Sequence, residues 1–378
     1  MDKLIPFNVP YVPEASKRYV LEVLDSNHQQ GDGPFTIKAS KMVSDLVGGG
    51  HVLLTPSCTH ALEMASMLAN LGPGDEVILP SYTFTSAATA VTKFGATPVF
   101  VDIEIETKGI DVSQVRDAIT PRTKAISWVN YAGVAPDIEG LQSLAKEFKL
   151  FLIEDNAHGL GGSYKGKPLG SFGHFATQSF HATKNIQCGE GGALVINSPK
   201  FVERAEVIRE KGTNRSKFIR GEVHKYQWVD QGSSYLLGES LAAILLGSLE
   251  HFREIQAGRE LVSNTYREML YDWASARNYQ LQDQKKSEIN SAHMFYMVSE
   301  TQKSREKLIE YLKKQGIQSM FHYQSLVDSK AGEVFRRIET VSTKSREMSN
   351  LLLRLPLYPS MTAEDLNFVV RKVLDFHD

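Results

Sequence analysis

Between residues 51 and 155, short apolar runs alternate with segments of helical spacing. Clear examples of the runs are EVILP (76–80), TPVFVDI (97–103) and FLIED (151–155). Strands that alternate with helices at this spacing usually pair in parallel, and the helices cover both faces of the sheet. The pattern therefore predicts an α/β fold with a large, mostly parallel sheet.

After Asp155 the alternation gives way to a different order of elements. We expect an arm and a helix before the turn-rich GDGP (31–34), and strands at 174–180 and 191–197 with no long helix between them. The other expected elements are helices at 198–212, 236–270 (with a break), 304–315 and 363–374, and a strand at 293–299. These features predict a large domain over 1–250, which includes the N-terminal arm, and a smaller α/β domain over 251–378.

Composition excludes several classes of protein. The chain has 378 residues and a formal net charge of −2, so it has no overall basic field that would attract nucleic acid. Its two cysteines, Cys58 and Cys188, form neither a metal-ligand spacing nor a disulfide framework. The N-terminus lacks the apolar core of a signal peptide, and no apolar run of about 18 residues is present. We expect a cytoplasmic protein with no membrane partner and no metal.

The first candidate cluster is TPSCTHALEM (55–64), where a strand gives way to a helix. A helix N-terminus has free N–H groups and a partial positive charge, and Ser57 and Thr59 add hydroxyl groups. Together these groups would hold a phosphate. Simple capping of the helix is the alternative role, since Ser and Thr serve as caps in many proteins.

The second candidate cluster is IEDNAH (153–158). Asp155 ends a buried strand, which is where open parallel sheets bind ligands. A carboxylate at this place can pair with a protonated pyridine nitrogen, and His158 could lie against the same ring. The structural alternative is that Asp155 caps a turn and that His158 is a hydrogen-bonded, partly buried histidine.

The third candidate cluster is QSFHATKNIQCGEGG (178–192), which forms a polar loop between two apolar strands. Loss of hydration in such a loop would lower the pKa of Lys184 and make its amine a nucleophile toward an aldehyde. Ser179 could reach a phosphate, and the glycines allow the backbone to pass close to a ligand. A solvated surface lysine is the alternative.

The three clusters follow one another along an alternating α/β chain: a phosphate-binding helix start, an aspartate at a strand end and a lysine in a loop. This order matches the arrangement of fold-type I pyridoxal-phosphate (PLP) enzymes. The chain also resembles the nucleotide-sugar aminotransferases of the DegT/DnrJ/EryC1/StrS family, from IPFN (5–8) to LRLPLY (353–358). The stretches that carry this resemblance include GDGPFT (31–36), PGDEVILPSYTF (73–84), YAGV (131–134), IEDNAHG (153–159), SFHATKN (179–185) and GEGGALV (189–195).

The resemblance implies a role for individual residues. It implies that Lys184 holds PLP as a Schiff base and moves the proton, and that Asp155 pairs with the pyridine nitrogen. It also implies a PLP-binding role for a further set of residues: Phe84 stacked on the ring, His158 near the hydroxyl, and Ser57, Cys58, Thr59 and Ser179 around the phosphate. In much of the family an asparagine of the partner subunit reaches the phosphate, and Ser234 stands at that position here.

A narrower resemblance concerns the substrate. The stretch 209–237, with HMFY (293–296) and FHY (321–323), is similar to the enterobacterial subgroup that makes dTDP-4-amino-4,6-dideoxygalactose. It implies a homodimer with shared active sites that transfers an amino group from L-glutamate to a dTDP-4-keto-6-deoxyhexose, for a surface polysaccharide. The basic run 209–225 is the candidate for contact with the diphosphate, and surface charge is its alternative role.

Other functions compete with this interpretation. A PLP-dependent sugar dehydratase of the same family replaces the Schiff-base lysine, and Lys184 speaks against it. A non-catalytic PLP or sugar binder would not need Asp155, Ser179 and Lys184 together. A nicotinamide-dependent enzyme would need a G-x-G-x-x-G after the first strand, which is absent. The sequence leaves open whether the product is the galacto or the gluco epimer, and whether C4 or C3 is aminated.

Overall fold

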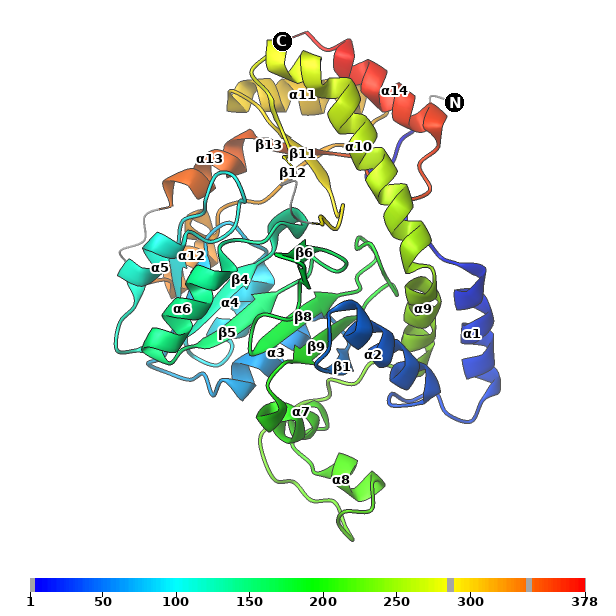
Figure 1. Ribbon diagram of the computed structural model, residues 1–378, viewed down its shortest axis with the longest axis vertical. Helices are drawn as coiled ribbons and strands as arrows, with labels where there is room; N and C mark the ends of the chain where they lie inside the picture. The colour runs from blue at the N-terminus through cyan, green and yellow to red at the C-terminus, as the bar shows by residue number, and fades with distance from the viewer. Residues whose placement is uncertain (1–3, 284–288, 338–341, 378) are drawn as a thin grey trace.

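A computed structural model gives the fold, and it describes residues 4–283, 289–337 and 342–377. Its centre is a seven-stranded sheet in the order β1-β9-β8-β5-β4-β2-β3 (Figure 1). The strands are β1 (His51–Thr55), β2 (Glu76–Pro80), β3 (Thr97–Val101), β4 (Thr123–Val129), β5 (Phe151–Asp155), β8 (Phe175–Ser179) and β9 (Gly192–Ile196). Only β9 runs against the other six, because it pairs antiparallel with both β1 and β8. The predicted mostly parallel sheet is confirmed.

Helices cover both faces of this sheet. Along β5, Ile153 faces one layer of helices and Leu152 faces the other, as the alternation of side chains along a strand requires. The first layer contains α3 (Cys58–Leu68), α4 (Thr85–Thr92) and α7 (Val202–Arg209). The second contains α2 (Pro34–Leu46), α5 (Val112–Ala118), α6 (Ile138–Phe148) and α9 (Glu239–Glu250). The core therefore lies in two layers, with the sheet between them.

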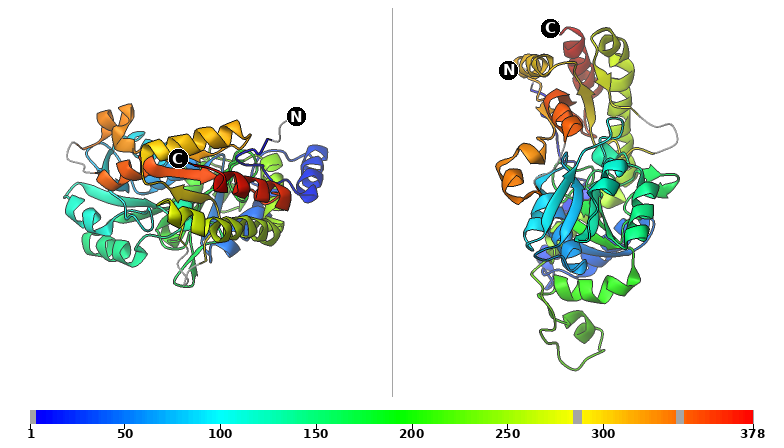
Figure 2. Two further views of the ribbon diagram at one scale, coloured as in Figure 1. Left: turned by 90° about the horizontal axis from the view of Figure 1, so that it is seen from above. Right: turned by 90° about the vertical axis from the view of Figure 1, so that its left-hand side faces the viewer.

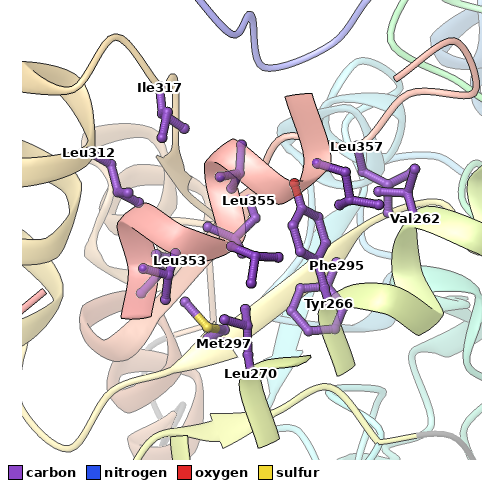
Figure 3. Close-up of a cluster of buried hydrophobic side chains, with 14 of the residues drawn as sticks. Val262, Tyr266, Leu270, Phe295, Met297, Leu312, Ile317, Leu353, Leu355 and Leu357 are labelled. Atoms are coloured by element: carbon purple, nitrogen blue, oxygen red, sulfur yellow. The ribbon is translucent and has the colours of Figure 1, made fainter. Parts of the chain in front are cut away.

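A second, antiparallel sheet of four strands is built from the last third of the chain, in the order β10-β11-β13-β12. Its strands are β10 (Gln280–Leu281), β11 (Phe295–Val298), β12 (Met320–Phe321) and β13 (Leu352–Leu355). The helices that belong with it are α10 (Phe252–Ala276), α11 (Gln302–Lys314), α13 (Thr343–Leu351) and α14 (Ala363–Leu374). Figure 3 shows how side chains of α10, β11 and β13 meet in its core.

The N-terminal arm joins the two sheets. Ile5 forms a parallel bridge with Ile317 and is buried in the core of the smaller sheet. The chain then reaches α1 (Glu14–Asp25), which packs beside α9 on the larger unit (Figures 1 and 2). The arm thus spans the boundary between the two sheets, and its residues lie close to the strand ends of both.

Short elements complete the described chain. They are α8 (Arg215–Ile219), α12 (Lys330–Phe335), the hairpin β6 (Ser163–Tyr164) and β7 (Lys167–Pro168), and 3-10 turns at Tyr131–Gly133, Pro199–Phe201 and Leu326–Asp328. No helix among the described residues is long and apolar enough to cross a membrane.

Most of the predicted elements are present, with boundaries shifted by a few residues. The expected helix over 236–270 is two helices, and His251 separates α9 from α10. The strands predicted at 174–180 and 191–197 are the antiparallel neighbours β8 and β9. The helix α2 was not expected, because its sequence PFTIKASKMVSDL has many polar residues and a weak apolar pattern.

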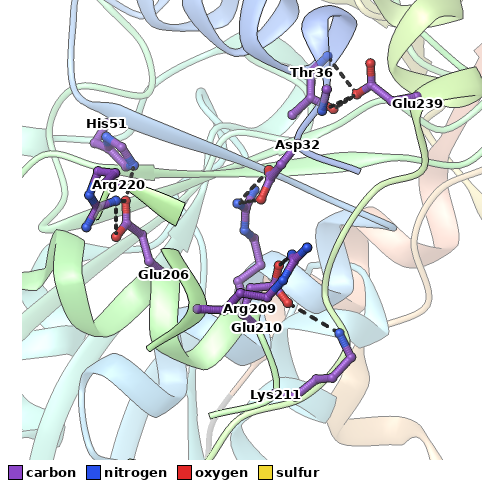
Figure 4. Close-up of polar contacts among 11 residues, drawn as sticks. Asp32, Thr36, His51, Glu206, Arg209, Glu210, Lys211, Arg220 and Glu239 are labelled. Carbon is purple, nitrogen blue, oxygen red and sulfur yellow. Dashed lines mark hydrogen bonds and ion pairs between the residues drawn. The ribbon is translucent and has the colours of Figure 1, made fainter. Parts of the chain in front are cut away.

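The start of α2 depends on a carboxylate from a distant part of the chain. No side chain at the N-cap residue Gly33 can accept the free N–H groups of the first turn. The fully buried Glu239 accepts them instead, from Gly33 N at 3.0 Å, Phe35 N at 2.9 Å and Thr36 N at 3.1 Å. It also accepts from the Thr36 hydroxyl (Figure 4). This contact attaches α2 to α9 and is the reason the helix begins at Pro34.

We expect Glu239→Gln to lower the free energy of unfolding by about 3 kcal/mol, because the new amide N–H₂ group would face donors and leave buried N–H groups unpaired. Urea denaturation followed by circular dichroism measures the change. Glu268→Gln, an exposed substitution on α10, is the matched control and should change stability by less than about 0.5 kcal/mol. Equal stabilities of the two variants would contradict the capping role.

Candidate active site

A cavity of about 620 Å³ opens where the carboxyl ends of the parallel strands meet the smaller sheet. Eight of the residues singled out from the sequence line it: Ser57, Cys58, Thr59, Phe84, Asp155, His158, Ser179 and Lys184. They come from segments up to 127 residues apart, and the sheet brings them together because strand ends share one edge. Within the described chain no group of three His, Cys, Asp or Glu side chains could hold a metal ion.

The first cluster forms the floor of this cavity at the start of α3. Ser57 is the N-cap residue, and its hydroxyl accepts the N–H of His60 at 3.2 Å, so the capping role is real. Cys58 and Thr59 belong to the same first turn, whose N–H groups have no partner within the helix, and both residues line the cavity. A Cβ on Gly192 would lie 2.4 Å from the Cys58 nitrogen, so only glycine lets β9 approach this turn.

Asp155 stands at the end of β5 beside the helix start. One of its oxygens accepts the N–H of Ala157 at 3.1 Å and lies 4.0 Å from the Cys58 sulfur. Burial raises the pKa of Asp155, while the Ala157 N–H and the positive charge of Lys184 act in the opposite direction. A carboxylate in this position favours a cation next to it, because a cation offsets the cost of its burial.

Lys184 extends from the loop that joins β8 to β9. The loop closes on itself through Ala182 N to Gly189 O and Lys184 N to His181 O, both 2.8 Å. Loss of hydration lowers the pKa of Lys184 to about 8, and the nearby Cys58 and Asp155 partly counteract this effect. A substantial share of the amine is therefore neutral, and nucleophilic, near neutral pH.

His158 is buried and held as one neutral tautomer. Its Nδ1 accepts the N–H of Ala132 at 3.4 Å, so the ring proton is on Nε2, which lies 3.2 Å from the hydroxyl of Tyr323. Its ring stacks on His293 with centroids 4.4 Å apart. Burial, followed by the charges of Lys184 and Arg354, lowers the pKa of His158 well below its usual value. The imidazole is thus uncharged at neutral pH.

Several cavity residues were not predicted from the sequence. His293, Tyr323 and Arg354 come from the smaller sheet and its loops, and Phe7 and Asn8 come from the N-terminal arm. The segments HMFY, FHY and IPFN were recognised only as resemblances, without a role for each residue. A usable signal existed for Arg354, because a charged residue inside the apolar run LLRLPLY is unusual.

Ser234 does not line the cavity of its own chain. It is exposed, and its backbone pairs with Glu210 at the base of a segment that extends from the body, residues 211–232, which we call the projecting segment (Figures 1 and 2). A contact between Ser234 and a ligand in this cavity would have to come from a second copy of the chain.

The basic run next to Ser234 is largely paired with carboxylates of the same chain. The ion pairs are Arg209–Asp32 at 2.6 Å, Lys211–Glu210 at 3.4 Å, Arg215–Glu210 at 2.7 Å, Lys217–Glu203 at 2.6 Å and Arg220–Glu206 at 3.0 Å, and Figure 4 shows several of them. Arg209 and Glu210 are buried, whereas Lys211, Arg215 and Arg220 are partly exposed, and exposed cations of this kind form weak ion pairs that a ligand could replace. Lys225 is exposed on the same segment and is in no ion pair among the described residues.

Known proteins are similar to this chain over nearly its full length. Residues 10–374 match the sequence pattern of the DegT/DnrJ/EryC1/StrS aminotransferase family. The uncharacterized protein MJ1066 of Methanocaldococcus jannaschii is 31% identical over 381 residues, which cover 97% of each protein. The PLP form of Spr1654 from Streptococcus pneumoniae has a TM-score of 0.89 at 26% identity, with 98% of each chain covered. DesI, solved in the presence of its TDP-sugar product, has a TM-score of 0.88 at 26% identity, with 99% of this chain and 93% of that chain covered.

We expect the reactivity of the Lys184 amine to follow its lowered pKa. Only the neutral amine reacts. With a pKa of about 8, about a tenth of the Lys184 side chains are neutral at pH 7, whereas for an ordinary lysine the neutral fraction is about one in 2,500. Trace acetylation of the cofactor-free protein between pH 6 and 11, with the Lys184 peptide quantified by mass spectrometry, measures this. The labelling should reach half of its maximum near pH 8 and level off about one pH unit higher. Exposed lysines in the same digest serve as references, and a midpoint for Lys184 above pH 10 would contradict the expectation.

Proposed function

This chain belongs to the DegT/DnrJ/EryC1/StrS aminotransferase family, and on that premise we propose that it transfers the amino group of L-glutamate to a dTDP-linked 4-keto-6-deoxyhexose. The proposed products are dTDP-4-amino-4,6-dideoxygalactose and 2-oxoglutarate. The family consists of PLP-dependent sugar aminotransferases, so PLP is the cofactor of this enzyme. The observation that carries the proposal is a desolvated Lys184 amine in one cavity with the strand-end carboxylate of Asp155.

The residues of the cavity fit PLP in three respects. The start of α3 offers N–H groups and a positive helix end for a phosphate, and Gly192 keeps its surroundings free of side-chain bulk. Asp155 offers a buried anion, and Lys184 offers a reactive amine. Phe84 leaves 55% of its surface exposed at the cavity, and a planar ring placed against it would cover that surface. Bound there, PLP supplies an aldehyde that links to amines and a ring that withdraws electrons.

We propose that Lys184 and Asp155 carry out the catalytic steps. With PLP bound, Lys184 Nζ would hold the cofactor, and once free the same amine would move a proton between carbon atoms of the substrate. Its pKa of about 8 suits both directions of this transfer near neutral pH. The Asp155 carboxylate would pair with the pyridine nitrogen and would keep the ring electron-withdrawing.

The other proposed contacts hold the cofactor in position. Ser57, Cys58, Thr59 and Ser179 bind the phosphate, Phe84 stacks on the ring, and His158 lies near the ring hydroxyl. The position of His158 supports its proposed contact with the ring hydroxyl. Contacts with Ala132 and Tyr323 fix the neutral imidazole, and its Nε2 carries the proton that it would donate.

We propose that the enzyme is a homodimer in which Ser234 of each chain reaches the cofactor phosphate of its partner. The projecting segment supports this arrangement because it exposes five large apolar side chains: Phe218, Ile219, Tyr226, Trp228 and Val229. Trp228 is 80% exposed, which is costly in water and would be relieved by contact with another subunit. Sedimentation velocity of the PLP-loaded protein measures its oligomeric state. A monomer at micromolar concentration would contradict the proposed homodimer.

The choice of sugar rests on two supports of different kinds. DesI, a structural relative, was solved with its TDP-sugar product, and the stretch 209–237 resembles the galactose-forming subgroup. Lys225 lies within that stretch, exposed and without an ion pair among the described residues, and it could meet the diphosphate. A sugar dehydratase is disfavoured because Lys184 is present. Since a surface polysaccharide is the use implied by this subgroup, we propose a cytoplasmic enzyme that supplies such a pathway.

The visible spectrum of the purified protein tests the proposal first. A yellow band that L-glutamate bleaches would establish the Lys184-bound cofactor and the first half-reaction together. The bleached protein should then convert dTDP-4-keto-6-deoxyglucose to an amino sugar, and the proton couplings at C4 distinguish an axial, galacto amine from an equatorial, gluco one. If the wild-type protein, which contains Lys184, stays colourless after PLP is added, the proposed function is refuted.

Replacement of Asp155 separates its catalytic role from turn capping. Asp155→Asn should lower the rate of the glutamate half-reaction by about 100-fold or more, because the positive charge on the ring is no longer held. It should also lower the pKa of Lys184 further, since the negative charge of Asp155 now raises it. The exposed Asp117→Asn on α5 is the control and should change neither value. A rate within a few-fold of wild type would mean that Asp155 only caps its turn.

A further inference from the structure

Asn130 is a fully buried amide next to the strand end that carries Asp155. It follows β4 directly, and Val129, the last residue of that strand, pairs with Asp155 of β5. Asn130 is not among the residues that line the cavity, so it reaches the site only through its neighbours. A buried amide is costly unless its polar groups have partners, and the partners of Asn130 therefore indicate its role.

Every polar group of the Asn130 side chain has a hydrogen-bond partner. The amide nitrogen donates to Glu154 Oε1 at 2.9 Å and to Asn156 Oδ1 at 2.8 Å. The amide oxygen accepts the indole N–H of Trp128 at 3.1 Å. In addition, the backbone N–H of Asn130 donates to the carbonyl oxygen of Asp155 at 3.1 Å. One residue thus holds three consecutive residues of the chain, with Asp155 in the middle.

The partners of this amide also fix its orientation. The indole N–H of Trp128 can only donate, so the oxygen of Asn130 faces it and the N–H₂ group faces Glu154 and Asn156. Glu154 receives further donors from Gly170 N at 2.7 Å and Phe172 N at 2.9 Å, which hold its carboxylate in place. Asp in place of Asn130 would lack the N–H₂ group, and Leu would lack the amide oxygen as well.

The same part of the chain also fixes His158. Ala132, two residues after Asn130, donates its N–H to His158 Nδ1 at 3.4 Å. Asn156 begins the turn that carries His158, because its carbonyl accepts the N–H of Gly159 at 3.0 Å. Asn130 and Ala132 therefore hold both groups that flank the proposed position of the cofactor ring, although neither residue lines the cavity.

We propose that Asn130 is a positioning residue, which holds the Asp155 carboxylate where the ring nitrogen of the cofactor binds. The inference rests on the proposed aminotransferase function and deepens it, because it names a residue outside the cavity on which that carboxylate depends. Among the described residues, the Asp155 carboxylate accepts a single backbone N–H, that of Ala157 at 3.1 Å. Its place is therefore set mainly by its own backbone, and a small displacement weakens its electrostatic effect strongly.

Three variants separate positioning from stability. Asn130→Leu keeps the branching of the side chain and removes its donors and its acceptor. Asn130→Asp keeps the acceptor for Trp128 and, as a neutral acid beside the Glu154 anion, keeps one donor. Tyr266→Phe is the matched control, because it removes a buried hydrogen bond of 2.9 Å to Pro356 O in the core of the smaller sheet (Figure 3). All three should lower the urea midpoint of unfolding.

The Lys184 amine of the cofactor-free protein reports the position of Asp155 without any turnover. The negative charge of Asp155 raises the pKa of Lys184, so a carboxylate that is held less firmly near the amine raises it less. In Asn130→Leu, the midpoint of Lys184 acetylation should fall by about half a pH unit. Asn130→Asp should shift it less far, and Tyr266→Phe should leave it at the wild-type value.

The glutamate half-reaction of the PLP-loaded protein gives the second readout. At saturating L-glutamate, bleaching of the yellow band should be about 30-fold slower in Asn130→Leu and about fivefold slower in Asn130→Asp. The glutamate concentration that gives half of the maximal rate should change by less than about twofold, because Asn130 does not line the cavity. Tyr266→Phe should bleach at the wild-type rate.

The proposal is overturned if Asn130→Leu folds and either its Lys184 midpoint does not fall or its bleaching rate stays at the wild-type value. Asn130 would then only stabilise the fold. Equal changes in Tyr266→Phe would also overturn it. If Asn130→Leu does not fold, Asn130→Asp decides by the same two measurements. A failure of the proposed function looks different, because wild-type protein would not be bleached by L-glutamate although its Lys184 midpoint still depends on Asn130.

Discussion

The site depends on the removal of water from one amine. Lys184 lies in a cavity between two sheets, and the loss of its hydration lowers its pKa to about 8. Asp155 limits this shift and is itself affected, since burial raises its pKa and the amine lowers it again. Neither group would have these properties alone on a surface, because water would stabilise the charged form of each. The fold therefore has to hold both groups at the strand ends and close the cavity over them.

Buried carboxylates that accept backbone N–H groups keep this frame rigid. Glu154, next to Asp155 on β5, accepts from Gly170 at 2.7 Å and from Phe172 at 2.9 Å, and so attaches the turn at 170–173 to the strand. Glu239 does the same for the start of α2. A buried charge that receives several donors replaces its lost water and sets the position of two segments at once. The end of β5 that carries Asp155 thus has a fixed neighbour in the turn at 170–173.

The smaller sheet completes the chemistry of the cavity. It contributes the Tyr323 hydroxyl that contacts His158, the His293 ring stacked on that imidazole, and the unpaired guanidinium of Arg354. These groups line the same cavity as Lys184, which comes from the larger sheet. The division suggests how one cavity could accept an amino acid and a nucleotide sugar in turn.

The sequence by itself determined the alternating α/β fold and the nucleus of the site. Strand and helix periodicity, the helix start at Ser57–Thr59, the strand end at Asp155 and the loop at Lys184 are all encoded by residues close to one another in the chain. Only the tertiary structure decided the rest. The capping of α2 by Glu239, the pairing of the basic run and the entry of Arg354 into the cavity depend on contacts between distant segments. Such contacts follow from sheet register and packing, which leave no local pattern in the sequence.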